Sequence, residues 1–402
     1  MAVEVPSDFL CPISLQIMRD PVTISTGIAY DRESIEKWLS SYKNRHVVVP
    51  SCPVTKQPLS ELDLTPNHTL RRLIQGWCSL STGDGVERIP TPKGEVDRGE
   101  VVKLVKEAMR CGSSRLECLK RLKAIVVENE RNKFYLQEVE SMEFLTSVLN
   151  NNDESVIEEA IEILSNTNLP TTLLKHLLTQ NPNLIQTLIS IITITKTSIS
   201  RAAAIAFLSS LYTISDQTHK TFTQDTLFIH LTRALSDQIA TNPSLQILLH
   251  LAPHGRNRFK AVKHGAVFHL IELLLSSSIP RECELAMATL DRLCECAEGR
   301  VELLRHGGGV AVVARKILRV SNLTNEKAVR ILYNVCKNNV GNFGVFEEMV
   351  VVGAVGKLCA VIEVGGSLKM IERVKVILHL IQRAFDGSTK CVIVVPRRFD
   401  RV

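Results

Sequence analysis

Two patterns of hydrophobic and polar residues divide the chain near residue 80. In the first part, short apolar runs at residues 22–24 and 28–30 lie on either side of the turn-forming residues 25–27. β-Prone runs that are separated by a short turn predict a β-hairpin. The first part of the chain is therefore predicted to contain a hairpin. Turn-forming residues are frequent throughout this part.

Two short helices are predicted behind this hairpin. Asp31 is a candidate N-cap, and Ile35, Trp38 and Leu39 recur at helical spacing behind it. A second helix is predicted from about Asn67, because the following apolar residues lie on one helical face. That face carries Leu70, Leu73, Ile74 and Trp77. Residues 6–78 thus predict a compact α+β module.

From Val101 onward the chain consists of amphipathic segments of about 10–15 residues, which predict helices. Self-alignment shows that these segments repeat with steps of 42 and then 46 residues, a period that is typical of armadillo and HEAT arrays. We expect about five or six repeats, with Gly307 in a turn between repeats. The matched positions are Arg258 and Arg300, Gly265, Gly307 and Gly353, Leu290, Leu332 and Leu378, Leu293, Val335 and Ile381, and Cys294 and Cys336.

The composition supports a folded protein and disfavours several function classes. Of 402 residues, 45% are hydrophobic and 22% are charged, which excludes wholesale disorder. The net charge of +6 lies downstream of residue 78 without a dense basic stripe, so no nucleic acid is expected as a partner. No run reaches the roughly 18 apolar residues of a membrane span, and no secretory signal pattern is present. Cysteines without paired spacing favour the cytoplasm, with the nucleus as a second location.

The N-terminal module contains five side chains of the kinds that bind metal ions. Structural zinc sites use four ligands, usually in closely spaced pairs such as Cys-x2-Cys. The sequence has no such pair, so we expect no metal and no cofactor, and cysteines that pack as small hydrophobic side chains. The possible ligands are Cys11, Cys52, Cys78, His46 and His68.

Three features of the second part suggest other chemistry but fit the repeats better. Cys294 and Cys296 resemble a redox or metal pair, yet Cys336 matches Cys294 at an apolar repeat position. The run His306 to Gly309 resembles the oxyanion loop of lipases, but the required Gly-x-Ser-x-Gly is absent from the sequence. Arrays that carry nuclear-import cargo use tryptophans, and residues 101–402 contain none.

The N-terminal module carries a long series of motif residues in a fixed order. This series closely resembles the U-box family over about 70 residues. Together with the repeats, the whole chain resembles the plant U-box/armadillo-repeat E3 ubiquitin ligases. The runs 85–92 and 296–300 resemble the subgroup that is tied to immune and stress responses. The motif residues are Phe9 to Ile13, Met18 to Val22, Gly27 to Arg32, Ile35, Trp38, Leu39, Cys52 to Thr55 and Leu64 to Ile74.

The resemblance implies a small α+β U-box with a RING-like fold that is held without metal, followed by an all-α armadillo solenoid. The expected boundaries are 5–79 for the U-box, 80–100 for a linker rich in glycine and proline, 101–386 for the array and 387–402 for a basic tail. A core this small contributes only about a few kcal/mol, so its polar groups must be well paired. The candidates for the network that replaces zinc are Asp20, Asp31, Arg32, Glu33 and Arg71, with solvated surface charge as the alternative for each.

The resemblance also implies a surface that binds a ubiquitin-conjugating enzyme, an E2. This surface maps onto Ile13 and Leu15 in the first loop, Trp38 on the helix and Pro53 in the second loop. Core packing is the alternative, most of all for Leu15 and Trp38. The family position that contacts ubiquitin is often arginine and is here Lys56, which keeps the charge but loses the planar fork. A solvated loop charge is the alternative for this residue.

On this basis we expect an E3 ubiquitin ligase that acts by positioning its partners. The U-box would bind an E2 charged with ubiquitin, the repeats would hold a protein target, and no cysteine of this chain would carry ubiquitin. Two alternatives are left open: an armadillo interaction protein with an inactive U-box, and a ligase with a covalent thiol relay. Self-association, the E2, the target and the effect of the long apolar loop at residues 42–51 are also left open.

Overall fold

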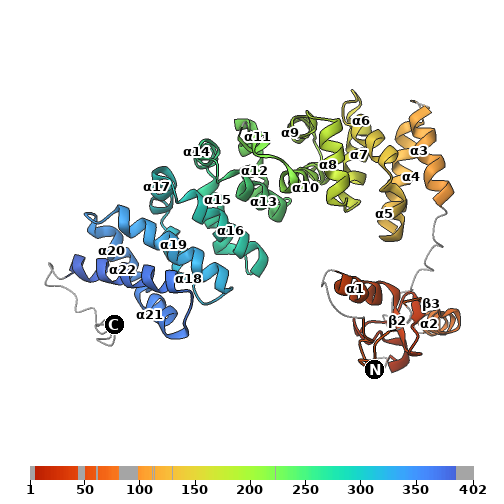
Figure 1. The fold of residues 1–402 in the computed structure, drawn as a ribbon, viewed down its shortest axis with the longest axis horizontal. Helices are drawn as coiled ribbons and strands as arrows, with labels where there is room; N and C mark the ends of the chain where they lie inside the picture. The colour runs from red at the N-terminus through yellow and green to blue at the C-terminus, as the bar shows by residue number, and fades with distance from the viewer. Residues whose placement is uncertain are drawn as a thin grey trace. The chain divides into compact units, whose positions relative to one another are not determined.

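The structure is a computed structural model of the chain, and it describes residues 5–43, 50–59, 62–80, 98–110, 112, 114–128, 130–221 and 223–385. The chain divides into two compact units, Met1–Val96 and Asp97–Val402 (Figure 1). Most of the expected linker, residues 44–49 of the long apolar loop and the expected basic tail lie outside the described residues.

The first unit contains a small antiparallel sheet in the strand order β2-β1-β3. Strands β1 (Pro21–Thr23) and β2 (Ala29–Asp31) form the predicted hairpin, with Val22 opposite Tyr30. Gly27 in the turn has φ +81°, a left-handed conformation that favours glycine. Strand β3 (Thr65–Pro66) pairs with the other edge of β1, and a 3-10 helix, η1 (Ser7–Phe9), precedes the sheet. The sequence did not predict β3, because two residues cannot show an alternating pattern.

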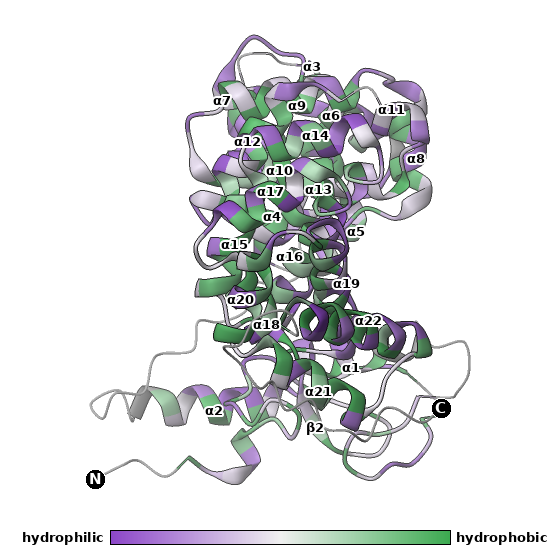
Figure 2. Ribbon diagram, turned by 90° about the vertical axis from the view of Figure 1, so that its left-hand side faces the viewer, coloured by the Kyte–Doolittle hydropathy of each residue, from purple (hydrophilic) through white to green (hydrophobic). Residues whose placement is uncertain are grey.

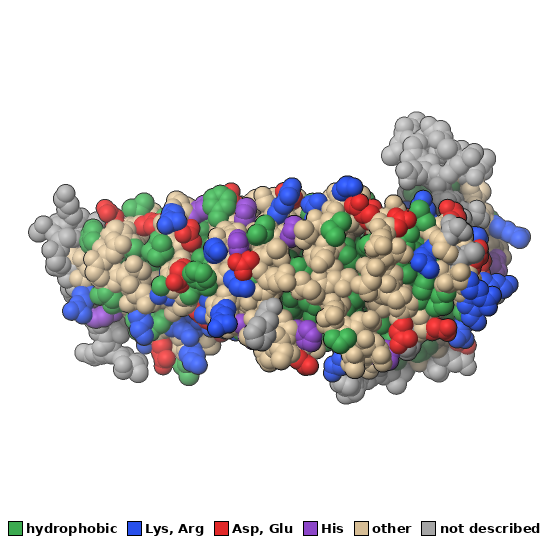
Figure 3. All heavy atoms as spheres, turned by 90° about the horizontal axis from the view of Figure 1, so that it is seen from above, with side chains coloured by type: hydrophobic (Ala, Val, Ile, Leu, Met, Phe, Trp, Pro, Cys, Tyr) green, Lys and Arg blue, Asp and Glu red, His purple; other side chains and the backbone are tan. Residues whose placement is uncertain are grey.

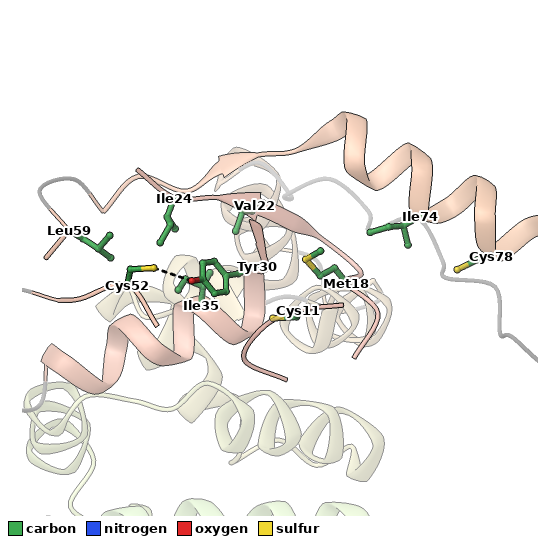
Figure 4. Close-up of a cluster of buried hydrophobic side chains, with 10 residues drawn as sticks. All are labelled: Cys11, Met18, Val22, Ile24, Tyr30, Ile35, Cys52, Leu59, Ile74 and Cys78. Atoms are coloured by element: carbon green, nitrogen blue, oxygen red, sulfur yellow. Dashed lines mark hydrogen bonds between the residues drawn. The ribbon is translucent and has the colours of Figure 1, made fainter. Parts of the chain in front are cut away.

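Both predicted helices of the first unit are present, α1 (Arg32–Lys43) and α2 (His68–Leu80). Asn67 caps α2, because its side-chain oxygen accepts the Leu70 amide at 3.0 Å. A compact core lies between the helices and the sheet (Figure 4). Its buried members are Cys11, Met18, Val22, Ile24, Tyr30, Ile35, Cys52, Leu59, Ile74 and Cys78.

The second unit is helical throughout its described residues, as the amphipathic pattern predicted. It opens with α3 (Arg98–Arg110) and α4 (Arg115–Glu128), and helix triplets follow. The first three triplets are α5 (Glu130–Leu136), α6 (Val139–Val148) and α7 (Glu154–Asn166), then α8 (Thr171–Gln180), α9 (Leu184–Ile194) and α10 (Ser198–Ile214), then α11 (Gln217–Thr221), α12 (Asp225–Ser236) and α13 (Thr241–Leu251). The next three are α14 (Gly255–Lys263), α15 (Ala266–Ser276) and α16 (Pro280–Leu293), then α17 (Ala297–Arg305), α18 (Gly309–Lys316) and α19 (Asn322–Asn338), then α20 (Phe343–Val351), α21 (Ala354–Val364) and α22 (Leu368–Phe385).

The third helices of successive triplets form a continuous layer along the array. Starting from α4, each of α7, α10, α13, α16, α19 and α22 packs against the one before it. Hydrophobic and hydrophilic positions alternate along the same helices, so that each helix buries one face (Figure 2). Charges of both signs and hydrophobic side chains are interspersed over the face that is seen in Figure 3. We call the continuous layer the third-helix layer.

Glycines mark the turn between the first and second helices of a triplet. Gly265 and Gly353 have φ of +83° and +74°, and each directly precedes a second helix. Gly307, which the repeat alignment matches to both, likewise lies between α17 and α18. The prediction that Gly307 lies between repeats was therefore wrong, because this tight turn reverses the chain within a triplet.

An arginine near the start of a first helix ties that helix to the triplet before it. Arg258 on α14 donates to the Ala252 carbonyl at 3.2 Å, and Arg300 on α17 donates to the Cys294 carbonyl at 3.1 Å. Both carbonyls belong to the end of the preceding third helix, where no intrahelical amide is available to them. The repeat-matched arginines thus satisfy polar groups at the junctions between triplets.

None of the helices within the described ranges has the length and hydropathy that crossing a bilayer requires.

Candidate functional site

Two loops of the first unit share a sequence pattern and the same main-chain hydrogen bonds. Residues 11–16 read Cys-Pro-Ile-Ser-Leu-Gln and residues 52–57 read Cys-Pro-Val-Thr-Lys-Gln. In each loop the cysteine amide donates to the glutamine carbonyl at 2.8 Å. The fifth residue donates its amide back to the cysteine carbonyl, at 2.8 Å from Leu15 and at 3.0 Å from Lys56. We call residues 11–16 the first loop and residues 52–57 the second loop.

Leu15 and Lys56 occupy equivalent strained positions in these loops. Their φ angles are +57° and +61°, in the left-handed region that non-glycine residues rarely adopt. Such strain persists only where the surrounding structure enforces it, and it is frequent at functional sites. The closed hydrogen-bonded loops enforce it here, and as a result two long side chains leave the loops at matching points.

The cysteine at the start of each loop is buried and accepts hydrogen bonds on its sulfur. The Asp31 amide lies 3.3 Å from Cys11 Sγ. Cys52 Sγ accepts from the Thr55 amide at 3.4 Å and from the Thr26 hydroxyl at 3.5 Å, and the Tyr30 hydroxyl lies 3.2 Å away (Figure 4). Loop amides and hydroxyls thus converge on one sulfur.

These contacts shift the acidity of the two thiols. Burial acts to raise the pKa of Cys52, but the hydrogen bonds from Thr55, Tyr30 and Thr26 outweigh it and lower that pKa to about 6. For Cys11, burial is likewise outweighed by hydrogen bonds from Ser14, Asp31 and Ile13, and the pKa is lowered. Among the described residues, no group of three histidine, cysteine or acidic side chains could hold a metal ion.

The predicted E2-binding residues lie on the two loops and on α1. Leu15 is 75% exposed, so it is a surface residue. Ile13 and Trp38 are partly buried against the core, and Pro53 is half-buried. The Trp38 ring N–H donates to the Ser51 carbonyl at 3.0 Å, which ties α1 to the start of the second loop.

Val54 was not among the predicted E2-binding residues, although it directly follows Pro53 in the second loop. It is the second-loop equivalent of Ile13, and its side chain is 51% exposed. The repeated Cys-Pro-x-Ser/Thr-x-Gln pattern was the signal that could have identified it. Leu15 and Val54 expose large apolar side chains on two loops of one small unit, and exposed apolar side chains of this kind are typical of a protein-binding surface.

Lys56 lies at the edge of the same surface. Its Nζ donates to the Pro53 carbonyl at 2.8 Å and lies 5.6 Å from the centre of the Trp38 ring. These contacts bring Trp38, Pro53 and Lys56 together. An ammonium group has three N–H donors, so donors are left for a partner while the side chain is held over the ring.

Polar residues behind the surface form a network that joins α1, α2 and the hairpin. Arg32 Nε lies 2.6 Å from the Asp20 carboxylate, and Arg71 lies 3.8 Å from its other oxygen. Asp31 accepts the amides of Arg19 and Asp20 at 2.8 and 3.0 Å. Four of the five predicted network residues are thus connected through Asp20.

Glu33 is the predicted network residue that lies apart from Asp20. It pairs with Lys37 across one helical turn, and both side chains are about 70% exposed. An exposed pair of this kind contributes little to stability, because water screens it. Glu33 lies on the exposed face of α1, whereas Arg32 on the same helix reaches Asp20. The sequence alone did not show which of these neighbouring residues faces Asp20.

Comparison with known families identifies both units. The U-box domain family matches residues 5–81, and the family described as the plant U-box protein ARM repeat region matches residues 100–395. The E3 ubiquitin-protein ligase PUB22 of Arabidopsis thaliana is 43% identical, over 96% of this chain and 96% of its own length. The E3 ubiquitin-protein ligase PUB24 of the same plant is 34% identical, over 94% and 92%.

Solved structures support the fold of the array. A structure from work on the interaction between cadherin and beta-catenin aligns with a TM-score of 0.57 at 16% identity, over 80% of this chain and 60% of that one. An engineered protein aligns with a TM-score of 0.50 at 18% identity, over 72% and 70%. Identities this low support the fold alone. With a family match that covers most of its length and relatives that align over more than nine-tenths of both chains, the chain belongs to the plant U-box proteins that carry an armadillo-repeat region.

Proposed function

We propose that the chain is an E3 ubiquitin ligase in which the U-box binds an E2 charged with ubiquitin and the array holds the protein to be modified. The observation that carries the proposal is the apolar surface on the two loops and α1, next to Lys56. Among its residues, Leu15 and Val54 are 75% and 51% exposed. The names of PUB22 and PUB24 as E3 ubiquitin-protein ligases support it.

In the proposed reaction the U-box contributes binding and orientation. The E2 would contact Ile13, Leu15 and Pro53. Trp38 would hold the second loop in place through its hydrogen bond to Ser51. Lys56 would donate hydrogen bonds to the bound E2 and ubiquitin together, which holds the conjugate in a closed geometry. Fixing two flexible partners in this way accelerates the attack of a lysine on the E2 thioester, because the orientation is prepared in advance.

The thiols argue against a covalent relay through this chain. The thiol of Cys52 has a pKa of about 6, but its side chain is completely buried. Cys296 and Cys359 are the partly exposed cysteines among the described residues, and burial raises the pKa of each. A nucleophilic cysteine needs both a low pKa and access, and none of the described cysteines combines the two.

The test is single-turnover discharge of ubiquitin from a charged E2 to free lysine, measured with a panel of E2s and the full-length chain. The proposal expects at least one E2 to discharge faster in the presence of the chain. Ubiquitin must not form a reducible adduct with the chain. If the chain binds no E2 and accelerates ubiquitin discharge from none of them, the proposal fails. The alternative of an armadillo interaction protein with an inactive U-box would then hold.

We also propose that the protein acts in the cytoplasm, or also in the nucleus, in a plant immune or stress response that ends in degradation of the target. The support for the location is the set of cysteines without paired spacing. The support for the pathway is the resemblance of the runs 85–92 and 296–300 to one subgroup of the family. Imaging of a tagged chain and target turnover after an immune elicitor would test the two statements separately.

A further inference from the structure

A cluster rich in arginine lies where α16 and α19 pack together in the third-helix layer. α16 and the turn behind it supply three of its residues, α19 supplies two, and the first helices α14 and α17 supply one each. We call it the arginine cluster. Its members are Arg258, Asp291, Arg292, Glu295, Arg300, Lys327 and Arg330.

The two carboxylates of the arginine cluster are already occupied. Asp291 is completely buried, and Arg330 binds it with two N–H groups, one of them at 2.5 Å. Lys327 Nζ lies 3.7 Å from the same carboxylate. Glu295 is shared by three guanidinium groups, from Arg258 at 2.7 Å, Arg292 at 3.0 Å and Arg330 at 3.4 Å.

The arginine cluster therefore carries more positive charge than its own carboxylates neutralise. Five cations face two carboxylates, and Arg300 donates to the main-chain carbonyls of Cys294 and Glu295 at 3.1 and 3.0 Å. A guanidinium group has five N–H donors in a planar fork, so sharing one carboxylate among three such groups leaves donors over. The side chain of Arg292 is 38% exposed, and those of Lys327 and Arg330 are 24% and 23% exposed.

Neighbouring residues extend the same surface along α19. Asn334 is the repeat equivalent of Arg292, and one turn further the exposed Lys337 lies 5.7 Å from the centre of the Tyr333 ring. The layer is not basic everywhere. The corresponding helix α7 carries four glutamates, and the described cations that pair with them are Lys123 and Lys196. The charge balance of the layer thus differs between α7, which is acidic, and the junction of α16 and α19, where cations outnumber carboxylates.

We propose that the arginine cluster and Lys337 bind an acidic segment, rich in aspartate or glutamate, of the protein that the array holds. This inference rests on the proposed function and names the chemistry of the target. Arginine forks match carboxylates in geometry, and the surplus charge gives such a segment a place to bind without breaking the existing pairs. The third-helix layer at α16 and α19 would select the target, while the U-box acts on it without regard to charge.

Peptide binding to the full-length chain tests this inference. The probe is a fluorescein-labelled peptide of alternating Glu and Ser, followed by anisotropy, with a Gln and Ser peptide of the same length as its uncharged match. The wild-type chain should bind the acidic peptide and not the neutral one. Arg292→Gln with Lys337→Gln should weaken that binding by about tenfold, which corresponds to about 1.4 kcal/mol.

The control variant is Arg315→Gln, which removes one exposed cation from α18, outside the third-helix layer. It should bind the acidic peptide as the wild type does. Within the described part of the chain Lys337 forms no ion pair, so Lys337→Gln alone should still weaken binding if the double variant does not fold. Equal binding of the acidic and neutral peptides, or unchanged binding by both folded variants, overturns the inference.

Two further measurements separate the possible failures. A peptide in which phosphoserine replaces glutamate would overturn the assignment to carboxylates if it binds and the glutamate peptide does not. E2 discharge measured on the same samples tests the proposed function. A chain that discharges ubiquitin but ignores the acidic peptide refutes only this inference, whereas a wild-type chain that discharges nothing refutes the ligase itself.

Discussion

The U-box and the armadillo array reach a folded state by different routes. The U-box has one small core with three cysteines among its ten buried residues, and it relies on specific polar contacts such as those of Asp20 and Cys52. The array buries large aliphatic side chains at every triplet, so that each repeat is supported by its neighbours. Single polar groups therefore decide the stability of the U-box, while distributed apolar contacts decide that of the array.

This difference can be measured in the intact chain. Both tryptophans, Trp38 and Trp77, lie in the U-box, so intrinsic tryptophan fluorescence reports on that unit. Far-UV circular dichroism is dominated by the helices of the array. Each variant can therefore be assigned to the unit that it affects.

The largest effect is expected when the apolar surface of the U-box is shortened. Ile13→Ala, Leu15→Ala and Pro53→Ala should each slow E2 discharge by about tenfold to a hundredfold, because a few anchors dominate a small interface. The dichroism of the array should not change. Leu73→Ala, at a 58% exposed apolar position on α2, is the matched control and should discharge normally. A fully active Leu15→Ala protein would show that the docking surface lies elsewhere.

The next largest effect is expected for the polar network of the U-box. Asp20→Asn should lower the free energy of unfolding of this unit by about 1–3 kcal/mol, because Arg32 and Arg71 lose a charged acceptor. Urea titration followed by tryptophan fluorescence measures it. Glu33→Gln removes only an exposed pair and should change the value by less than about 0.5 kcal/mol. Equal shifts for both variants would contradict the special role of Asp20.

A smaller kinetic effect is expected for Lys56. Lys56→Ala should slow discharge by about tenfold at saturating E2 while the affinity for the E2 changes little, since the apolar residues supply that affinity. Lys56→Arg should match or exceed the wild type, because a guanidinium can reach two acceptors from one plane. Equal discharge rates for Lys56→Ala and the wild type would leave Lys56 as a surface charge.

The stability of the U-box is expected to depend on pH through Cys52. The pKa of Cys52 is lowered from 9.0 to about 6 on folding, so between these values the unfolded thiol binds a proton that the folded one has lost. The stabilisation from this group is complete above about pH 9 and disappears as the pH falls to about 6. Urea titrations across this range should show it in the wild type and less of it in Cys52→Ser. A pH dependence that is unchanged in Cys52→Ser would assign it to another group.

No effect at all is expected from chelation. The described residues bring no three metal-binding side chains together, and hydrogen bonds converge on Cys52 instead. Treatment with a zinc chelator should leave tryptophan fluorescence, dichroism and discharge unchanged. Stoichiometric zinc by elemental analysis would contradict this prediction. So would a change of tryptophan fluorescence to that of the unfolded U-box on chelation.

Much of the fold could be read from the sequence because its determinants are local. The hairpin around Gly27 and the helix behind Asp31 depend on residues a few positions apart. The repeats of the array can be recognised in the sequence because each triplet buries its apolar residues against its neighbours in the same way. The spacing of these residues therefore recurs. The motif order then placed Ile13, Trp38, Pro53 and Lys56 through resemblance, before any geometry was known.

The tertiary structure decided the features that join residues far apart in the chain. It exposed Val54 at the second-loop position equivalent to Ile13, put Leu15 and Lys56 in left-handed conformations and separated Glu33 from Asp20. It also gathered Arg258, Asp291, Glu295 and Arg330 across a repeat boundary, over separations of 37 and 39 residues. Periodicity shows which face of a helix is buried, but which charges meet depends on how neighbouring helices pack, and no local pattern contains that information.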